Sequence, residues 1–259
     1  MAELLTRREG AVGWIEFSNP ARRNAVTYEM LRALPEAIGR HERSGQVRLI
    51  AITGTGEHFV SGADISEFAA TRGSHYAAVS YGGVVEAAYE AFESVTKPTL
   101  AKIRGACMGV GLSLALCADL RVAAESASIS HPASRFGMGV SYGSISRLVG
   151  LIGAGQTAEL IFTARKYPAA EALQMRLLTR VVPDAGLDRE FDALCADIAA
   201  GSPLTLSAAK RAIAATLKDP AERDLKSLVA LINACNSSED YKEGIAAFRE
   251  KRAPNFRGR

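Results

Sequence analysis

Apolar and polar positions along the first fifty residues predict a hairpin, a helix and a buried strand. Residues 4–8 and 12–17 are separated by a turn pair and show strand-like alternation, which predicts an opening hairpin. Apolar residues recur at helical spacing behind Thr27, a residue type that caps helices, and this helix is expected to end near Ser44. The short apolar run at 47–53 is typical of a buried strand.

The alternation of helix and strand then repeats without a strict sequence repeat. A helix-like stretch around 84–92 precedes a predicted strand at 99–103. A helical segment at 112–117 leads to extended segments at 120–123 and 126–131. Strands separated by helices imply crossover connections, so the expected fold class is α/β.

From Gly155 onward the pattern becomes mainly helical, with five successive segments of helical periodicity. Several are rich in alanine and carry apolar residues on more than one face. Such helices usually pack against a neighbour, which can belong to the same chain or to another subunit.

Composition excludes several classes of protein. The 259 residues are 48% hydrophobic and 23% charged, as in ordinary globular chains, and a net charge of +3 does not indicate a nucleic-acid partner. The four cysteines form no CxxC pair, so neither a zinc site nor a disulfide framework is predicted. The N-terminus lacks the apolar core of a secretory signal, and no window offers about 20 apolar residues for a membrane span. We expect a cytoplasmic protein.

The segment GEHFVSGADISEF at 56–68 places a glycine-bearing turn and polar residues directly after the predicted buried strand. Gly62 lets the backbone bend so that amide groups can face a ligand. The alternative is a plain strand-to-helix connection in which Ser61 or Asp64 is a helix cap, and this segment alone favours that alternative.

The segment at 103–123 places Gly105, Gly109 and Gly111 before an apolar helix. Unpaired N–H groups at a helix start, together with the helix dipole, suit an anionic phosphate or an oxygen that becomes negative during reaction. The alternative is tight helix packing, since glycine also permits close backbone approach, and the spacing is not a dinucleotide fingerprint.

Together the two segments resemble the enoyl-CoA hydratase/isomerase family, also called the crotonase superfamily. The resemblance covers nearly the whole chain, from SNPARRNAVTYEML (18–31) through SGADI and GACMGVGLSLALCADLRVA to SSEDYKEGIAAFREKRAPNF (237–256). It implies a crotonase (ClpP-like) spiral of β-β-α units over residues 1–195, which carries the acyl-CoA site. Residues 196–259 are then a C-terminal helical trimerisation region, and the implied assembly is a homotrimer or a dimer of trimers.

The resemblance also implies an oxyanion hole for a thioester carbonyl. Its two donors are the backbone amides of Ala63, which precedes the aspartate of the GAD motif, and of Val110, where many members have glycine. Coenzyme A enters as part of the substrate, and no metal or redox cofactor is required. The substrate-binding positions implied by the resemblance are Arg23, Ala25, Ala63, Asp64, Ile65, Ser66, Val110, Phe248 and Lys251.

The sequence departs from the family at the acid–base positions. Hydratases of the family use two glutamates, and Ser113 and Ala133 stand at those positions here. A serine is a poor base near neutral pH and an alanine cannot transfer protons, so ordinary hydration is in doubt. The candidate replacements are His131 and Tyr142, the latter in a loop expected at 137–148, although a structural histidine and a packed tyrosine are the alternatives.

Three hypotheses therefore stay open for the function. The first is an enoyl-CoA hydratase/isomerase-like enzyme that acts on an acyl-CoA through an oxyanion-stabilised intermediate. The second is a crotonase-fold enzyme of different chemistry, namely a decarboxylase, thioesterase or C–C hydrolase. The third is a non-catalytic acyl-CoA-binding protein.

Overall fold

A computed structural model describes residues 2–259, apart from the side chains of residues 70, 72, 77 and 78. Its main sheet has six strands in the order β1-β2-β3-β4-β6-β9. The expected opening hairpin is confirmed, because β1 and β2 pair antiparallel, and the other neighbours pair parallel. The strands are β1 Glu3–Glu9, β2 Val12–Ser18, β3 Leu49–Gly54, β4 Thr99–Ile103, β6 Leu120–Ala124 and β9 Arg180–Val182.

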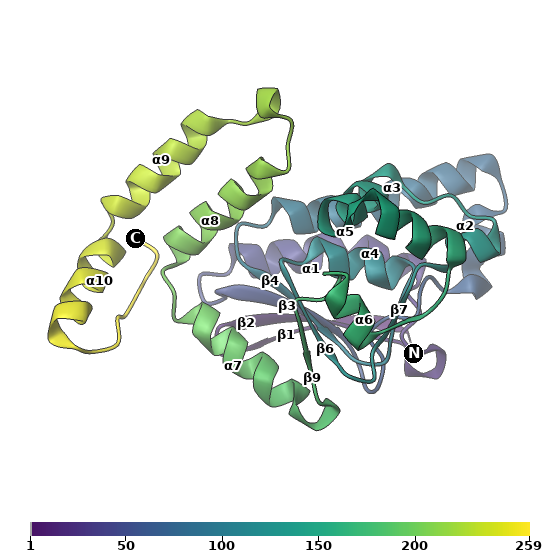
Figure 1. Cartoon of the computed structure of the whole chain (residues 1–259), viewed down its shortest axis with the longest axis horizontal. Helices are drawn as coiled ribbons and strands as arrows, with labels where there is room; N and C mark the ends of the chain where they lie inside the picture. Colours follow the sequence, from purple (N-terminus) through teal and green to yellow (C-terminus); the bar gives the residue numbers. More distant parts are fainter. Residues whose placement is uncertain (1) are drawn as a thin grey trace.

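Helices cover both faces of this sheet (Figure 1). On one face α1 (Tyr28–Arg43) and α3 (His75–Ser94) pack over a large core, and on the other α7 (Leu187–Ala199) packs over a smaller one. In β3, Ile50 lies in the large core and Leu49 in the small one. A strand buried on both faces reads as a continuous apolar run, which is why β3 was predictable from its sequence.

A second, three-stranded sheet lies beside the main one and has the order β5-β7-β8. Its strands are β5 Ala106–Met108, β7 Ser128–Ser130 and β8 Tyr167–Pro168. The helix α4 (Val110–Cys117) starts two residues after β5, and α5 (Tyr142–Thr163) packs against α4. These connections carry the glycine-rich segments, so they position the candidate site.

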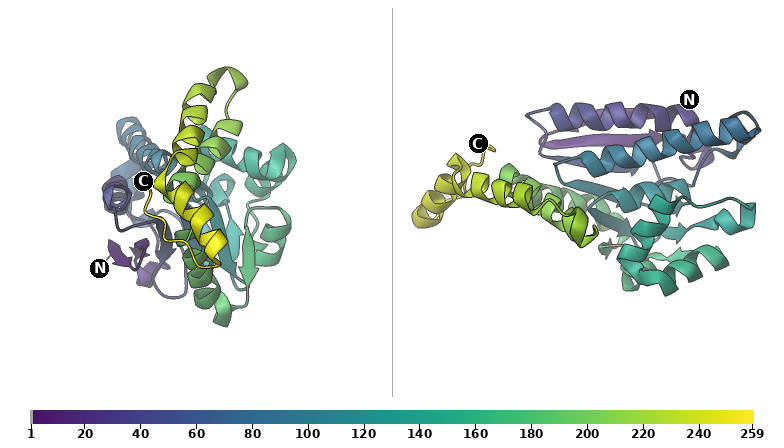
Figure 2. Two further views of the ribbon diagram at one scale, coloured as in Figure 1. Left: turned by 90° about the vertical axis from the view of Figure 1, so that its left-hand side faces the viewer. Right: turned by 90° about the horizontal axis from the view of Figure 1, so that it is seen from above.

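The last three long helices extend away from the core at one end of the molecule, as Figure 2 shows. They are α8 (Pro203–Thr216), α9 (Leu225–Asn236) and α10 (Glu239–Glu250). The remaining helices are α2 Phe68–Arg72, α6 Ala169–Gln174 and the 3-10 turns η1 Pro20–Arg22, η2 Ile65–Glu67, η3 Pro132–Phe136, η4 Asp184–Gly186 and η5 Pro220–Glu222. Within residues 2–259, none of the helices combines the length and apolarity that crossing a bilayer requires.

The structure differs from the expected elements in two places. The region after Gly155, expected to be mainly helical, also contributes the short strands β8 and β9. Tyr142, expected in a loop, is the first residue of α5, because Ser141 caps that helix by accepting a hydrogen bond from the Ser144 amide at 3.3 Å.

Candidate active site

The two glycine-bearing segments run side by side in matching register. Val60 pairs with Cys107 in a parallel bridge, and the Val60 carbonyl accepts the Met108 amide at 2.9 Å. Ala63 lies three residues after Val60, and Val110 lies three residues after Cys107. The register therefore places Ala63 and Val110 at equivalent positions along the two paired segments. The place where these two residues meet is called the junction below.

Glycine is required at the turn of each segment. Gly62 has φ 126°, and Gly109 has φ 53° with ψ −118°, conformations that side chains strongly disfavour. The two turns also approach closely, since a Cβ at position 109 would lie 3.9 Å from the Gly62 Cα. Both glycines thus serve to aim the amide that follows them.

The amides that follow these glycines are free to donate to a ligand. Val110 is the first residue of α4, so its N–H has no intrahelical acceptor. Among the described residues no acceptor is found for the Ala63 or the Val110 amide. Both residues are partly exposed.

The loop before α1 holds the Ala63 segment in place. Val26 donates to the Gly62 carbonyl at 2.8 Å, and its own carbonyl accepts the Asp64 amide at 2.8 Å, so the Ala63 amide points away from this bridge. Buried Asn24 fixes the loop, because its side-chain amide donates to the Thr55 and His58 carbonyls at 2.8 and 2.7 Å. The sequence placed Asn24 in a loop expected near the ligand but did not indicate this positioning role, and its only signal was an asparagine in a turn, where the left-handed φ of 58° is tolerated.

Asp64 is a helix cap rather than a free carboxylate. Its side chain accepts the Ser66 amide at 3.0 Å and the Ser66 hydroxyl at 2.7 Å, and it forms an ion pair with Arg22. Burial opposes ionisation of Asp64, but the hydrogen bonds from Ser66 and Arg22 outweigh it and hold the pKa of Asp64 below its ordinary value. The Asp64 side chain is therefore a helix cap, as the alternative interpretation of this segment expected. The Ala63 amide beside it has no acceptor among the described residues and can donate to a ligand.

Two other glycines permit close backbone packing, which was the alternative interpretation of the glycine-rich segment. A Cβ at Gly111 would lie 2.3 Å from the Val60 carbonyl oxygen, and one at Gly105 would lie 2.5 Å from the Glu57 carbonyl oxygen. Gly111 lets the first turn of α4 press against the neighbouring segment. The glycine-rich segment thus has one glycine that aims an amide and two that permit close contact.

The two positions at which the resemblance implies glutamates are buried beside this junction. Ser113 is 3% exposed on α4, and its hydroxyl accepts from Ser144 at 3.1 Å. Ala133 is 4% exposed in η3, near the turn, since Pro132 would contact a Cβ at Gly109 at 4.0 Å. Neither position carries a group that can act as an acid or base near pH 7.

The two candidate replacement residues have contrasting environments. His131 is 7% exposed, its Nδ1 atom has no partner among the described residues, and burial lowers the pKa of its ring. It is therefore neutral near pH 7. Tyr142 is 86% exposed at the start of α5, so the alternative of a packed tyrosine does not hold within this chain.

The other predicted binding residues divide into two groups. Arg23, Ala25, Ile65 and Ser66 lie around the Ala63 segment, with Arg23, Ile65 and Ser66 exposed and Ala25 buried. Phe248 and Lys251 lie at the end of α10, in the helices that extend away from the core containing α4 (Figures 1 and 2). Within one chain the structure does not bring these two residues to the junction.

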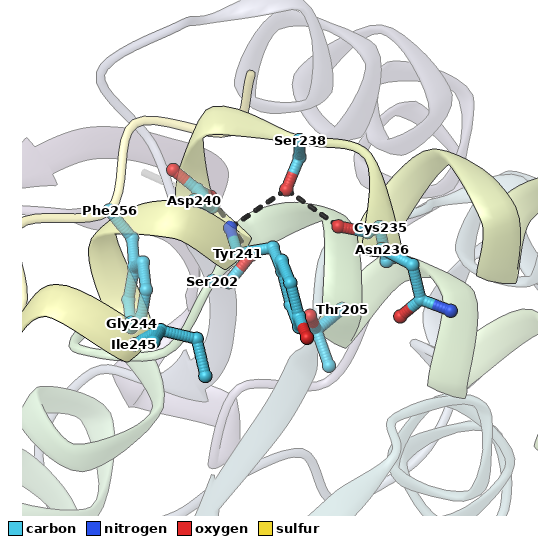
Figure 3. Close-up of a pocket in the computed structure, with 10 residues that line it drawn as sticks. All are labelled: Ser202, Thr205, Cys235, Asn236, Ser238, Asp240, Tyr241, Gly244, Ile245 and Phe256. Atoms are coloured by element: carbon cyan, nitrogen blue, oxygen red, sulfur yellow. Dashed lines mark hydrogen bonds between the residues drawn. The ribbon is translucent and has the colours of Figure 1, made fainter. Parts of the chain in front are cut away.

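A cavity of about 230 Å³ lies elsewhere, between α8, α9, α10 and the C-terminal tail (Figure 3). Its polar groups serve the chain's own turns: the Ser238 hydroxyl donates to the Cys235 carbonyl at 2.7 Å and accepts the Tyr241 amide at 3.0 Å. Buried Asp240 accepts the Arg257 amide at 2.7 Å and so holds the tail. Across the described chain, no group of three or more His, Cys, Asp or Glu side chains is placed to bind a metal ion.

Solved structures with this arrangement define the fold class. The chain superposes on an enoyl-CoA hydratase/carnithine racemase from Magnetospirillum magneticum with a TM-score of 0.95 and 32% identity, covering 100% of this chain and 97% of the other. An enoyl-CoA hydratase/isomerase family protein from Hyphomonas neptunium gives a TM-score of 0.93 and 33% identity, covering 99% and 98%. The fold is therefore the crotonase fold, an α/β architecture with a C-terminal helical region, as expected.

The sequence comparisons identify the family. The model for enoyl-CoA hydratase/isomerase matches residues 7–259. A probable enoyl-CoA hydratase from Rhodobacter capsulatus is 33% identical over 248 residues, which are 95% of this chain and 94% of that protein. This chain belongs to the enoyl-CoA hydratase/isomerase family, and the resemblance inferred from its motifs is confirmed.

Proposed function

We propose that the protein binds an acyl-CoA thioester with the carbonyl oxygen between the Ala63 and Val110 amides. The observation that carries this proposal is the matched register of the Ala63 and Val110 N–H groups, which lack acceptors among the described residues and belong to partly exposed residues. Two such donors stabilise the negative charge that develops on a thioester oxygen when an enolate or a tetrahedral intermediate forms. The family's relatives named as hydratases support a thioester substrate.

The reaction proposed is acyl-CoA chemistry through an oxyanion-stabilised intermediate, without the two-glutamate addition of water. Ser113 and Ala133 leave that addition without its acid and base. A decarboxylase, thioesterase or C–C hydrolase that uses His131 or Tyr142 is the alternative enzyme. A non-catalytic acyl-CoA-binding protein is the second candidate, favoured by the burial of an inert alanine at position 133.

Calorimetry with a matched pair of ligands tests the binding proposal. Butyryl-CoA and its thioether analogue S-butyl-CoA differ only at the carbonyl group that the two amides would bind. We expect micromolar binding of butyryl-CoA, about −8 kcal/mol, and clearly weaker binding of the thioether. Equal affinity for the two ligands would contradict the proposal, because binding would then not involve the carbonyl.

We also propose a homotrimer or a dimer of trimers, in which residues 196–259 are the trimerisation region. The support is an apolar surface on the extended helices: Ile213, Leu217 and Val229 are exposed, and Phe248 is 85% exposed. In this assembly Phe248 and Lys251 would reach the site of an adjacent subunit. Deleting residues 240–259 should weaken both association in sedimentation and CoA binding, whereas a trimeric, fully binding truncated protein would contradict the role.

The proposed compartment is the cytoplasm. The four cysteines, at positions 107, 117, 195 and 235, are all unpaired in the structure. Unpaired thiols, two of them buried, suit a reducing compartment.

A further inference from the structure

The position of α10 relative to the core depends on contacts outside the helices and strands. The helix α8 is tied to the core directly, because Lys210 Nζ donates to the Lys97 carbonyl at 2.9 Å and forms an ion pair with Asp119 at 2.8 Å. Among the helices and strands of the described chain, α10 makes extensive contact only with α9. Both helices extend beyond the core (Figure 2), so another segment must fix α10.

The C-terminal tail, residues 252–259, returns along α10 and reaches the core. The Phe256 ring packs on α10 at Gly244, since a Cβ there would lie 3.5 Å from the ring (Figure 3). The Phe256 carbonyl accepts a hydrogen bond from the guanidinium of Arg48, the residue that precedes β3. The tail therefore connects α10 with the edge of the main core.

Asp240, in the first turn of α10, holds the tail in place. It is 3% exposed, and its two carboxylate oxygens accept the Arg257 amide at 2.7 Å and the Gly258 amide at 3.0 Å. The hydroxyl of Ser202, the residue before α8, also donates to this carboxylate at 2.9 Å. In return, the Asp240 amide donates to the Arg259 carbonyl at 3.1 Å. One residue thus joins α10 to the tail and to the start of α8.

Burial of Asp240 makes its charge depend on the tail. A buried carboxylate is costly unless hydrogen-bond donors surround it. Within the described chain the donors to the Asp240 side chain are two amides of the tail and one hydroxyl. Release of the tail would leave the Ser202 hydroxyl alone, so the carboxylate favours the closed arrangement.

We propose that residues 252–259 are a strap, held by Asp240, that fixes α10 relative to the core. A second carboxylate of α10 reinforces the strap: Glu243 accepts both terminal nitrogens of Arg252 at 2.6 and 2.9 Å, and the Asn255 amide at 2.8 Å. The functional consequence rests on the proposed assembly, in which the strap would hold Phe248 and Lys251 where an adjacent subunit needs them.

The same contacts have a simpler interpretation, in which the tail only adds to the stability of the whole chain. The two interpretations differ in where the effect of opening the tail appears. A strap predicts local opening of α10 while the core stays closed, and native-state amide hydrogen exchange reports such local opening. A general contribution to stability predicts the same change in exchange for α1 and for α10.

Hydrogen exchange of the full chain, followed by mass spectrometry, tests the strap at Asp240. Asp240→Asn replaces one acceptor oxygen with an NH2 group that faces a donor. We expect the α10 amides to exchange about 10- to 100-fold faster, the factor that corresponds to the loss of one hydrogen bond to a charged group, and α1 to keep its wild-type rate. Glu239→Gln is the matched control, since it removes the same charge from the same turn at an exposed side chain that pairs with Lys242.

Two further variants open the strap elsewhere. Arg48→Ala removes the contact with the core from outside α10, and deletion of residues 253–259 removes most of the strap. Both should accelerate exchange in α10, whereas Gln46→Ala, an exposed position in the same loop as Arg48, should not. Wild-type exchange of α10 in either variant overturns the strap, and so does equal acceleration in α1 and α10 or a Glu239→Gln variant that behaves like Asp240→Asn.

Sedimentation and butyryl-CoA calorimetry on the same variants separate the strap from the proposed function. Faster exchange in α10 together with weaker association and weaker binding supports both. Faster exchange with unchanged association and binding keeps the strap and contradicts the role proposed for Phe248 and Lys251. A wild type that neither associates nor binds butyryl-CoA overturns the proposed function, while the exchange rates of α10 still decide whether the strap exists.

Discussion

The candidate site has two layers, the proposed oxyanion donors and the proposed acid–base groups, and the two are provided by backbone and side chains respectively. The donors at Ala63 and Val110 are backbone amides, fixed by the Val60–Cys107 bridge and aimed by Gly62 and Gly109. The proposed acid–base layer consists of side chains, and Ser113 and Ala133 stand where the family resemblance implies glutamates. A backbone donor survives a change of side chain, whereas an acid or base does not. The proposed site would therefore keep its oxyanion-stabilising amides while its proton chemistry differs from that of a two-glutamate hydratase.

The largest expected effect comes from restoring the acid–base layer. Wild-type protein should hydrate crotonyl-CoA very slowly, and Ser113→Glu with Ala133→Glu should raise the rate by about 100-fold or more. Each single replacement should do less, since the two acids act as a unit. The measurement is the loss of enoyl-thioester absorbance, with folding checked because both positions are buried and a buried carboxylate costs stability. Fast hydration by the wild type would contradict the claim that the acid–base positions lack groups for the addition of water.

The next largest effect comes from removing one backbone donor. Val110→Pro deletes the amide hydrogen at the first helical position, where proline is best tolerated. We expect a loss of about 100- to 1,000-fold in α-hydrogen exchange of butyryl-CoA, the usual effect of removing one oxyanion donor. Val110→Ala keeps the amide and should stay near the wild-type rate. Equal rates for proline and alanine would show that this amide plays no part.

A smaller effect is expected from the packing that supports the donors. Gly111→Ala would place a Cβ 2.3 Å from the Val60 carbonyl oxygen, so the backbone must shift. We expect a decrease of about 1–3 kcal/mol in the free energy of unfolding, measured by urea titration. Gly150→Ala is the control, because nothing lies within 4 Å of its Cβ position. A stability unchanged by Gly111→Ala would mean that α4 does not need this close approach.

The smallest effect concerns the ion pair beside Ala63. Arg22→Ala should decrease the free energy of unfolding by less than about 1 kcal/mol at pH 7, because the Arg22 side chain is half-exposed. The pKa of Asp64 is lowered in the folded state, so the contribution is present above its ordinary value of 3.8 and is lost as the pH falls below it. Urea titrations at pH 7 and pH 3 should show the difference shrinking, and a constant difference would exclude this linkage.

The sequence predicted the parts of the fold that depend on local pattern. β3 and α1 were predictable because their apolar spacing and the Thr27 cap are continuous in sequence. β9 was missed because it is three residues long and takes its place through pairing with β6, a neighbour distant in sequence. The start of α5 was missed because its glycines and serines read as a loop.

In the candidate site, too, some features depend on local sequence and others on contacts between distant segments. Ala63 and Val110 were assigned through the family resemblance, which the GAD motif and the glycine-rich turn carry as local features of the sequence. The contact between Ser113 and Ser144 joins residues 31 apart on two different helices. Such a contact depends on how α4 and α5 pack, so no spacing in the sequence indicated it.

The infrared frequency of a bound thioester carbonyl tests the proposed oxyanion hole most directly. With butyryl-CoA labelled by carbon-13 at its carbonyl, two aimed amides should polarise the C=O bond and lower its stretching frequency below the value in water. Val110→Pro should bind the ligand with a smaller shift. A carbonyl that keeps its aqueous frequency when bound to the wild type would contradict the account, because the Ala63 and Val110 amides would then not contact the substrate oxygen.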